Sequence, residues 1–290
     1  MSAPAFLVGN RTGGQGKTLI SQMIHYGHIL GQMPIKAVSA DSAKAGGESK
    51  LGRLLGTGNV VELGTGADMS AVREDHHEAV RYWDQLGEHL YDGNCVIDLG
   101  ANILPLIFQW ATERKAARLL RDRAIALVVP VTAQAQSISD AIEMLEMSDA
   151  CQHVLPISQR YVILNEYHGT FDRLQGDRRF QNLLNPDLGL NKKVVRLSKA
   201  NVEIWGDIEA RNMSFHQLGN MQIEEYKKVF ELPTRFAASG AEIAFDEWNK
   251  ATLECFVNVG LVPAAALGNL KGAEKKDGVS ADKKAGAKAA

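Results

Sequence analysis

The sequence predicts an α/β fold in which a doubly wound, mostly parallel β-sheet carries helices on both faces. Short apolar runs alternate with longer stretches of helical periodicity about six times, as strand–helix units do. The runs are too short and too continuously apolar for a sheet that faces solvent. The chain has 290 residues, of which 45% are hydrophobic and 23% charged, so it can bury a sizeable core.

Strands and helices alternate through the N-terminal half of the chain. The predicted strands are Ala5–Val8, Ile35–Val38, Cys95–Leu99 and the β-branched run Ala124–Val131. The predicted helices are Lys17–Leu30, Met69–Tyr91, Ile103–Leu120 and Ser137–Glu146. On Met69–Tyr91, one face is shared by Val72, Val80, Trp83, Leu86 and Leu90. Gly, Ser and Thr are frequent in Gly46–Gly66, which predicts a loop with one helical turn.

The C-terminal half continues the pattern and then changes composition. Its predicted strands are Tyr161–Leu164 and Val194–Leu197, and its predicted helices are Gln222–Glu231 and Ala241–Val257. Residues 268–290 hold six Lys against three acidic residues and almost no large apolar side chain. Such a segment buries too little surface to fold. We therefore predict one folded domain over residues 1–267, followed by a disordered Lys/Ala/Gly-rich tail over residues 268–290.

Composition excludes several classes of protein. No run of eighteen apolar residues is present, so a transmembrane helix is not expected. The first ten residues lack the basic n-region and cleavage site of a secretion signal. Three scattered cysteines support neither a disulfide framework nor a zinc site. The net charge of −2 gives the chain as a whole no electrostatic attraction to nucleic acid. The expected location is the cytoplasm.

The strongest motif is GNRTGGQGKT, residues 9–18, which joins the first predicted strand to the first predicted helix. Glycines in such a loop let successive N–H groups point at a phosphate, and the helix N-terminus adds partial positive charge. Lys17 is then expected to reach the β- and γ-phosphates, and Thr18 to hold Mg²⁺. The strict P-loop pattern fails, because Arg11 stands where its first glycine belongs.

Residues Gly13–Thr18 match the deviant Walker A motif, K-G-G-x-G-K-[ST], of the ParA/MinD ATPases, a family that also lacks the first P-loop glycine. The order of later motifs extends this resemblance over about residues 4–235. The family's signature lysine, which reaches the phosphates of a partner subunit, aligns with Thr12, and the adjacent Arg11 is the candidate substitute cation. The resemblance implies a P-loop NTPase fold with ATP and Mg²⁺ as cofactors. The implied cofactor-binding residues are Arg11, Thr12, Gly13, Gly14, Gln15, Gly16, Lys17, Thr18, Leu19 and Asn165.

Three later positions complete the predicted site. Asp98 ends an apolar strand, as a Walker B aspartate does, and is expected to hold Mg²⁺ through water together with Thr18. By resemblance, Asp41 orients the attacking water, although Ser39 replaces the first Asp of the family's D-x-D. Asn165 ends the strand whose asparagine reads adenine in this family. Lys17, Asp41 and Asp98 are therefore the predicted catalytic residues.

Other charged clusters carry weaker hypotheses. In Asp75–Glu78, adjacent side chains diverge by about 100° on a helix, so a solvated face is favoured over a metal site. A basic cluster, formed by Arg114, Lys115, Arg118, Arg121 and Arg123, is a candidate contact for DNA phosphates, although a solvated helix end explains it equally well. Acidic residues on the polar side of the C-terminal helix argue against membrane binding.

The resemblance implies a nucleotide-dependent switch. In such a switch, ATP favours a sandwich homodimer that binds DNA or a protein partner, and hydrolysis releases it. The implied roles are DNA segregation, plasmid stability, conjugative transfer or cargo positioning. Two alternatives stay open. One is a binding module that hydrolyses ATP weakly, which Thr12 and Ser39 favour. The other is an ATP-dependent ligase or amidase-like enzyme of the dethiobiotin or cobyrinate type.

Overall fold

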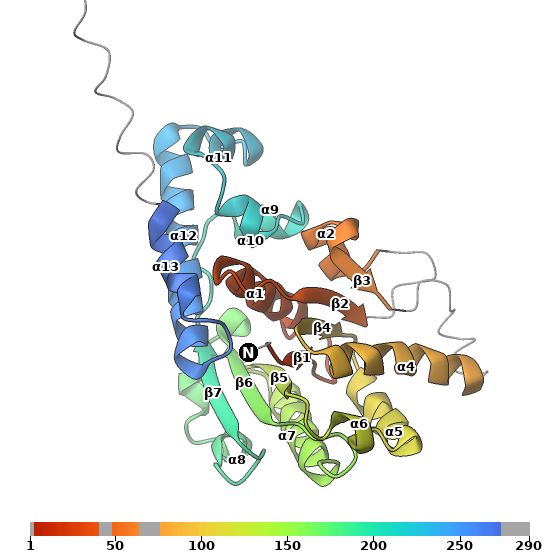
Figure 1. The fold of residues 1–290 in the computed structure, drawn as a ribbon. Coiled ribbons are helices and arrows are strands. Elements are labelled where there is room, and N and C mark those ends of the chain that lie inside the picture. The colour runs from red at the N-terminus through yellow and green to blue at the C-terminus, as the bar shows by residue number, and fades with distance from the viewer. Residues whose placement is uncertain (1–2, 41–47, 64–75, 274–290) are drawn as a thin grey trace, which may run out of the picture.

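A seven-stranded parallel sheet forms the centre of the computed structural model, which describes residues 3–40, 48–63 and 76–273 (Figure 1). The strand order is β3-β2-β4-β1-β5-β6-β7, and every neighbouring pair is parallel. The strands are β1 (Ala5–Val8), β2 (Lys36–Ala40), β3 (Val60–Glu62), β4 (Cys95–Leu99), β5 (Ile125–Thr132), β6 (Gln159–Asn165) and β7 (Lys192–Leu197). This topology confirms the predicted fold class.

Helices cover both faces of the sheet (Figure 1). One face packs against α4 (His76–Asp92), α5 (Ile103–Arg114), α6 (Ala117–Leu120), α7 (Ala135–Ala150) and α8 (Arg178–Leu184). The other packs against α1 (Lys17–Leu30), α2 (Lys50–Leu55), α9 (Trp205–Ala210), α10 (Phe215–Leu218), α11 (Ile223–Val229), α12 (Arg235–Val259) and α13 (Ala265–Ala273). Short 3₁₀ helices lie at Thr57–Asn59, Glu166–His168 and Phe171–Leu174. No helix among the described residues is long and apolar enough to span a bilayer.

Alternation along the buried strands divides the core into two layers. Ala5 and Leu7 of β1 belong to the layer beneath α4–α8, whereas Phe6 and Val8 belong to the layer beneath α1 and α12. Both sets of side chains are buried because helices cover both faces of a parallel sheet. This burial explains the continuous apolar runs from which the strands were predicted.

Two differences from the predicted elements have local causes. The three-residue strand β3 lies in the predicted loop Gly46–Gly66, and it is too short to show a period. The predicted helix Ile103–Leu120 is divided into α5 and α6 because Lys115 takes a left-handed backbone conformation with φ 52°. On α4, the predicted face buries Trp83, Leu86 and Leu90 as expected, and Val72 lies outside the described residues.

The folded chain continues past the predicted domain boundary at residue 267. Helix α13 runs to Ala273, and Leu267 and Leu270 pack against the core layer beneath α1 and α12. Asn269 also donates a hydrogen bond to the carbonyl oxygen of Leu30. The composition of residues 268–290 does not indicate these contacts, because within that segment they are made by one apolar residue, Leu270, and one amide, Asn269. The remainder of the predicted tail, residues 274–290, lies outside the described residues.

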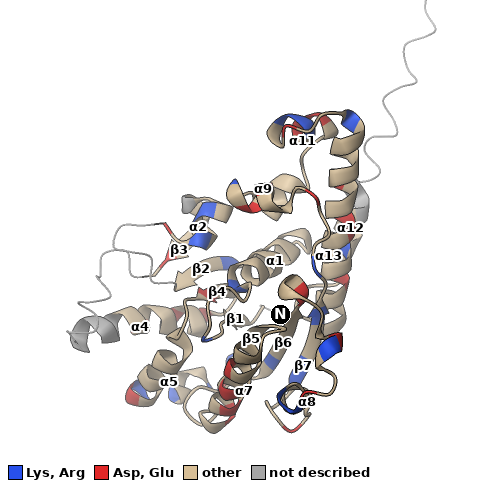
Figure 2. Cartoon of the chain, turned by 180° about the vertical axis from the view of Figure 1, so that it is seen from behind, with Lys and Arg blue, Asp and Glu red and all other residues tan. Residues whose placement is uncertain are grey.

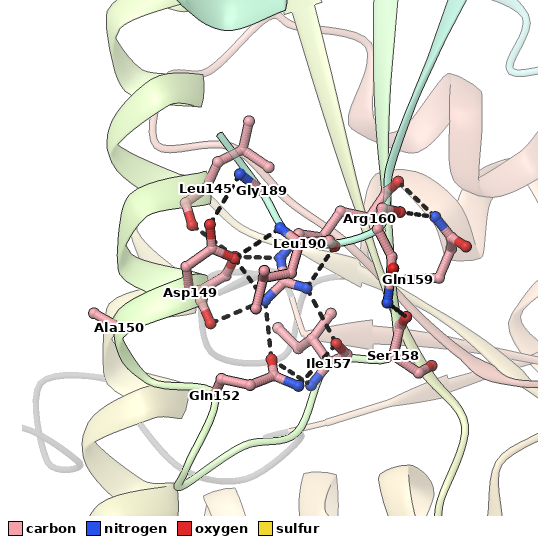
Figure 3. Close-up of polar contacts among 12 residues, drawn as sticks. Leu145, Asp149, Ala150, Gln152, Ile157, Ser158, Gln159, Arg160, Gly189 and Leu190 are labelled. Carbon is pink, nitrogen blue, oxygen red and sulfur yellow. Dashed lines mark hydrogen bonds and ion pairs between the residues drawn. The ribbon is translucent and has the colours of Figure 1, made fainter. Parts of the chain in front are cut away.

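A buried arginine fixes the C-terminal end of α7 to the sheet (Figure 3). Arg160, near the start of β6, is fully buried, and its guanidinium lies 3.0 Å from the carboxylate of Asp149. It also donates to Ser148 and Gln152 on the helix side. The backbone carbonyls of Ile157 and Leu190 accept two further hydrogen bonds. Burial lowers the pKa of Arg160 from its usual value, and the nearby carboxylate opposes this shift.

Histidine burial predicts a loss of stability in acid. Burial, together with the neighbouring His28 and His216, lowers the pKa of His25 to about 4. Between pH 6.5 and 4 the unfolded chain therefore binds a proton that folded His25 does not, so the free energy of unfolding falls as pH falls. We expect His25→Gln to show a smaller decrease of Tm between about pH 7.5 and 5 than the wild type. The exposed His153→Gln is the control, and equal pH dependence in all three proteins would contradict the assignment.

Candidate functional site

The predicted site residues that the structure describes meet at the carboxyl edge of the sheet. The phosphate loop follows β1, Asp98 lies near the end of β4, and Thr132 and Asn165 end β5 and β6. These strands are adjacent and parallel, so their carboxyl ends share one edge. In open α/β sheets, ligands bind at this edge.

Glycine gives the phosphate loop its shape at two positions. Gly14 and Gly16 adopt φ values of 74° and 86°, which other residues avoid. Gly16 is also the N-cap residue of α1, so the loop leads directly into a helix N-terminus. A Cβ atom on Gly16 would lie 2.5 Å from Nδ2 of Asn165. The left-handed backbone and the nearby amide of Asn165 therefore both favour glycine at this position.

Lys17 folds back over the loop. Its Nζ donates to the carbonyl oxygen of Thr12 at 3.0 Å and lies 3.5 Å from that of Asn10. The ammonium group thus lies over the loop that would surround a phosphate. This is the position from which a P-loop lysine contacts the β- and γ-phosphates.

Asp98 and Thr18 are in direct contact. The Thr18 hydroxyl donates to one carboxylate oxygen of Asp98 at 2.8 Å, and Ser21 donates to the other at 3.1 Å. Asp98 is only 3% exposed. Hydroxyl and carboxylate oxygens are ligands that Mg²⁺ prefers, so this pair fits the predicted ion. Ser21 was not predicted, although it lies one helical turn after Thr18, and that spacing could have identified it.

Gln15 fastens the loop to the end of β5 and the start of α7. The residue is 2% exposed, and its Oε1 accepts hydrogen bonds from the hydroxyls of Thr132 and Ser137. Its Nε2 donates to the carbonyl oxygen of Gly13 at 3.0 Å. Thr132 and Ser137 were not predicted, and no local motif identifies them because they lie more than a hundred residues away from Gln15.

Asn165 and Leu19, two predicted nucleotide-binding residues, have side chains that contact the protein itself. Nδ2 of Asn165 donates to the carbonyl oxygen of Gln15 at 3.1 Å, while Oδ1 accepts from the N–H of Tyr167. The amide of Asn165 therefore supports the loop, and adenine recognition by this residue stays a prediction. Leu19 is partly buried against the core in the first turn of α1. Asp41, the predicted water-orienting residue, lies outside the described residues.

The side chains of Arg11 and Thr12 in the loop are bound by α7 of the same chain. Arg11 forms an ion pair with Glu143, and the hydroxyl of Thr12 donates to Asp140. The side chain at the family's signature-lysine position therefore has a partner within its own subunit. Neither acidic residue was singled out from the sequence.

Two further charged clusters, Asp75–Glu78 and the basic cluster, were considered as metal and DNA sites, respectively. Within the described ranges, no group of three or more His, Cys, Asp or Glu side chains could hold a metal ion, and Asp75 lies outside those ranges. In the basic cluster, Arg114 pairs with Asp84, and Arg123 stacks on the ring of Tyr91 at 3.8 Å. Lys115, Arg118 and Arg121 are not buried, so DNA contact stays a hypothesis.

Alanine at Gly16 is expected to reduce stability. A left-handed non-glycine residue costs about 1–2 kcal/mol, and the new Cβ would also press on Asn165, so we expect a total loss of about 2 kcal/mol. The measurement is the free energy of unfolding by urea. Gly13→Ala is the matched control because a Cβ at Gly13 has no heavy atom within 4 Å. Equal stability of the two variants would contradict the steric argument.

Comparisons with known proteins give structural likeness only. No protein-family model and no curated protein matches the chain. The similar solved structures include the following three. A ParA family ATPase from Chlorobium tepidum TLS is 16% identical, with a TM-score of 0.46 over 84% of this chain and 98% of the other. The ATP complex of a Cyanothece McdA variant is 14% identical, with a TM-score of 0.44 over 84% and 97%. The MinC:MinD cell division protein complex of Aquifex aeolicus is 16% identical, with a TM-score of 0.42 over 83% and 94%.

Proposed function

We propose that the chain is an ATPase of the ParA/MinD type that binds ATP with Mg²⁺. The observation that carries the proposal is the arrangement of the phosphate loop. Lys17 lies over a loop with left-handed glycines at the start of a helix, and Thr18 touches Asp98 at the next strand end. These are the parts that phosphoryl transfer uses for positioning and charge stabilisation.

Each residue of the proposed site has a distinct role. The backbone N–H groups of Gly13–Thr18 and the ammonium of Lys17 bind phosphate oxygens. Thr18 and Asp98 would hold Mg²⁺, the latter through water, and Asp41 would orient the attacking water. When bound, the ion supplies positive charge that neutralises the phosphate oxygens.

We further propose that ATP drives formation of a homodimer that acts in DNA segregation, plasmid stability, conjugative transfer or cargo positioning. The support is the resemblance of Gly13–Thr18 to the deviant Walker A motif. The dimer would bind either DNA, without sequence preference, or a protein partner. The cytoplasm is the corresponding location.

A second candidate is a binding module that retains ATP but hydrolyses it slowly. One observation favours it: the hydroxyl of Thr12 is bound by Asp140 of its own chain. Position 12 holds threonine rather than lysine, so it cannot supply the cation that reaches the phosphates of a partner subunit. The two candidates differ in turnover, because both require nucleotide binding.

Light scattering coupled to size-exclusion chromatography tests the switch. Wild type and Lys17→Ala are each run with Mg²⁺ and either ADP, ATP or a non-hydrolysable ATP analogue. The expected result is a doubling of mass in the wild type with ATP or the analogue only. Unchanged mass despite bound nucleotide would overturn the dimer switch and favour a ligase-like enzyme or a constitutive binder. Phosphate release measured in parallel separates an ATPase from the slowly hydrolysing module.

A further inference from the structure

One face of α7 binds the phosphate loop through three consecutive turns. Ser137, Asp140 and Glu143 are spaced three residues apart, so they lie on the same side of the helix. They contact three different loop side chains, which are Gln15, Thr12 and Arg11, respectively. The far end of α7 is held by Arg160, so the helix presents this face from a fixed position.

The three contacts differ in exposure. Gln15, Ser137 and Asp140 are buried, at 2%, 0% and 5% exposure, so the first two contacts are shielded from water. The side chains of Arg11 and Glu143 are 40% and 51% exposed. Exposed ion pairs contribute at most about 1 kcal/mol, so the Arg11–Glu143 pair is the contact that a competing anion can break.

Acidic residues continue along α7. Asp140, Glu143, Glu146 and Asp149 recur every three residues, and the helix contains no Lys or Arg (Figure 2). Asp140 accepts hydrogen bonds from the neutral side chains of Thr12 and Gln136. An anion that enters the loop therefore meets carboxylates on this side, and like charges repel. If Arg11 moves from Glu143 to the anion, its positive charge attracts the anion and offsets the repulsion by these carboxylates.

We propose that Arg11 is a phosphate ligand whose ion pair with Glu143 opens for a nucleoside triphosphate but not for a diphosphate. This inference rests on the proposed ATP site. Arg11 lies between Asn10 and Thr12, whose carbonyl oxygens flank the ammonium of Lys17. That ammonium marks the β/γ end of a bound nucleotide, so Arg11 is placed next to the γ-phosphate. Glu143 is then a positioning residue that sets discrimination between the two nucleotides.

Calorimetric titration with a non-hydrolysable ATP analogue and with ADP, each with Mg²⁺, tests the exchange. Removal of the competing carboxylate in Glu143→Gln is expected to tighten analogue binding about threefold and to leave ADP binding unchanged. Arg11→Ala should weaken analogue binding about tenfold and again spare ADP, because one charge-assisted phosphate contact is lost. Arg11→Lys should recover part of the loss, since it keeps the charge but not the bidentate geometry.

Glu146→Gln is the matched control. Glu146 is exposed on the next turn of α7, carries the same charge, and has no hydrogen bond or ion pair with another described residue. Its replacement changes the net charge equally, so a result equal to that of Glu143→Gln would overturn the proposal. Unchanged discrimination in Arg11→Ala would also overturn it while leaving the ATP site intact. If wild type binds neither nucleotide, the proposed function itself fails before any variant is compared.

Discussion

Replacement of Lys17 by alanine is expected to weaken ATP binding at least about a hundredfold, because a charge-assisted contact to each of two phosphates is lost, at about 1.5–3 kcal/mol each. The Lys17 ammonium lies 3.0 Å from the carbonyl oxygen of Thr12, over the phosphate loop. Lys17 is the first residue of α1 and is only partly buried, so its side chain contributes little to the packing of the core. The fold should therefore survive the substitution.

Calorimetric titration with ATP and Mg²⁺ measures this loss, and the Tm without nucleotide checks the fold. Lys50→Ala is the control, because Lys50 is an exposed lysine at the start of another helix, α2. Its affinity for ATP should equal that of the wild type. An affinity of Lys17→Ala within about threefold of the wild type would contradict the assignment of Lys17 to the phosphates.

Sequence reasoning succeeded where a signal is local. Strands β1 and β4 and helix α1 have the predicted bounds, since each has a continuous apolar run or a clear helical period. The loop Gly13–Thr18 was found for the same reason, because adjacent residues carry the whole motif. The motif and the rule that ligands lie at strand ends predicted that Thr18 and Asp98 share one Mg²⁺ ion, and the structure shows the two side chains in direct contact.

The supporting contacts of the loop could not be predicted in this way. Ser137 and Glu143 reach the loop only because α7 packs beside it after the chain has crossed the sheet. Helical periodicity predicts that α7 exists, but it does not give the neighbour that its polar face meets. For this reason the sequence left open whether Arg11 has a partner, which the structure identifies as Glu143.

Arg160 is a residue that the apolar pattern does not reveal. The predicted strand starts at Tyr161 because the apolar run covers only Tyr161–Leu164. The observed strand β6 starts at Gln159 and includes Arg160 as a fully buried residue. Its partner Asp149 and the acceptors around it come from α7 and the segment before β7, and no sequence pattern shows that they meet.

Replacement of Arg160 by leucine is expected to lower the free energy of unfolding by about 3–5 kcal/mol, the cost of breaking a buried ion pair from one side. Leucine fills only part of the volume and leaves the carboxylate of Asp149 without its cation. The hydroxyl of Ser148 also loses a donor, and so does the carbonyl of Leu190 (Figure 3). The loss is costly at Ser148, which is fully buried, because water cannot replace the missing donor there.

Urea unfolding of Arg160→Leu, Arg160→Lys and Arg179→Leu distinguishes two effects on stability, the loss of the Arg160 contacts and the loss of one positive charge. Arg179 is exposed on α8, so its replacement should change stability by no more than about 0.5 kcal/mol. Lysine at position 160 retains the charge but cannot supply five fixed donors, so its stability should lie between wild type and leucine. If Arg160→Leu is as stable as Arg179→Leu, the guanidinium does not anchor α7. Helix α7 contacts Arg11 and Thr12 nearer its N-terminal end. Another contact would then have to fix the position of this helix beside the phosphate loop.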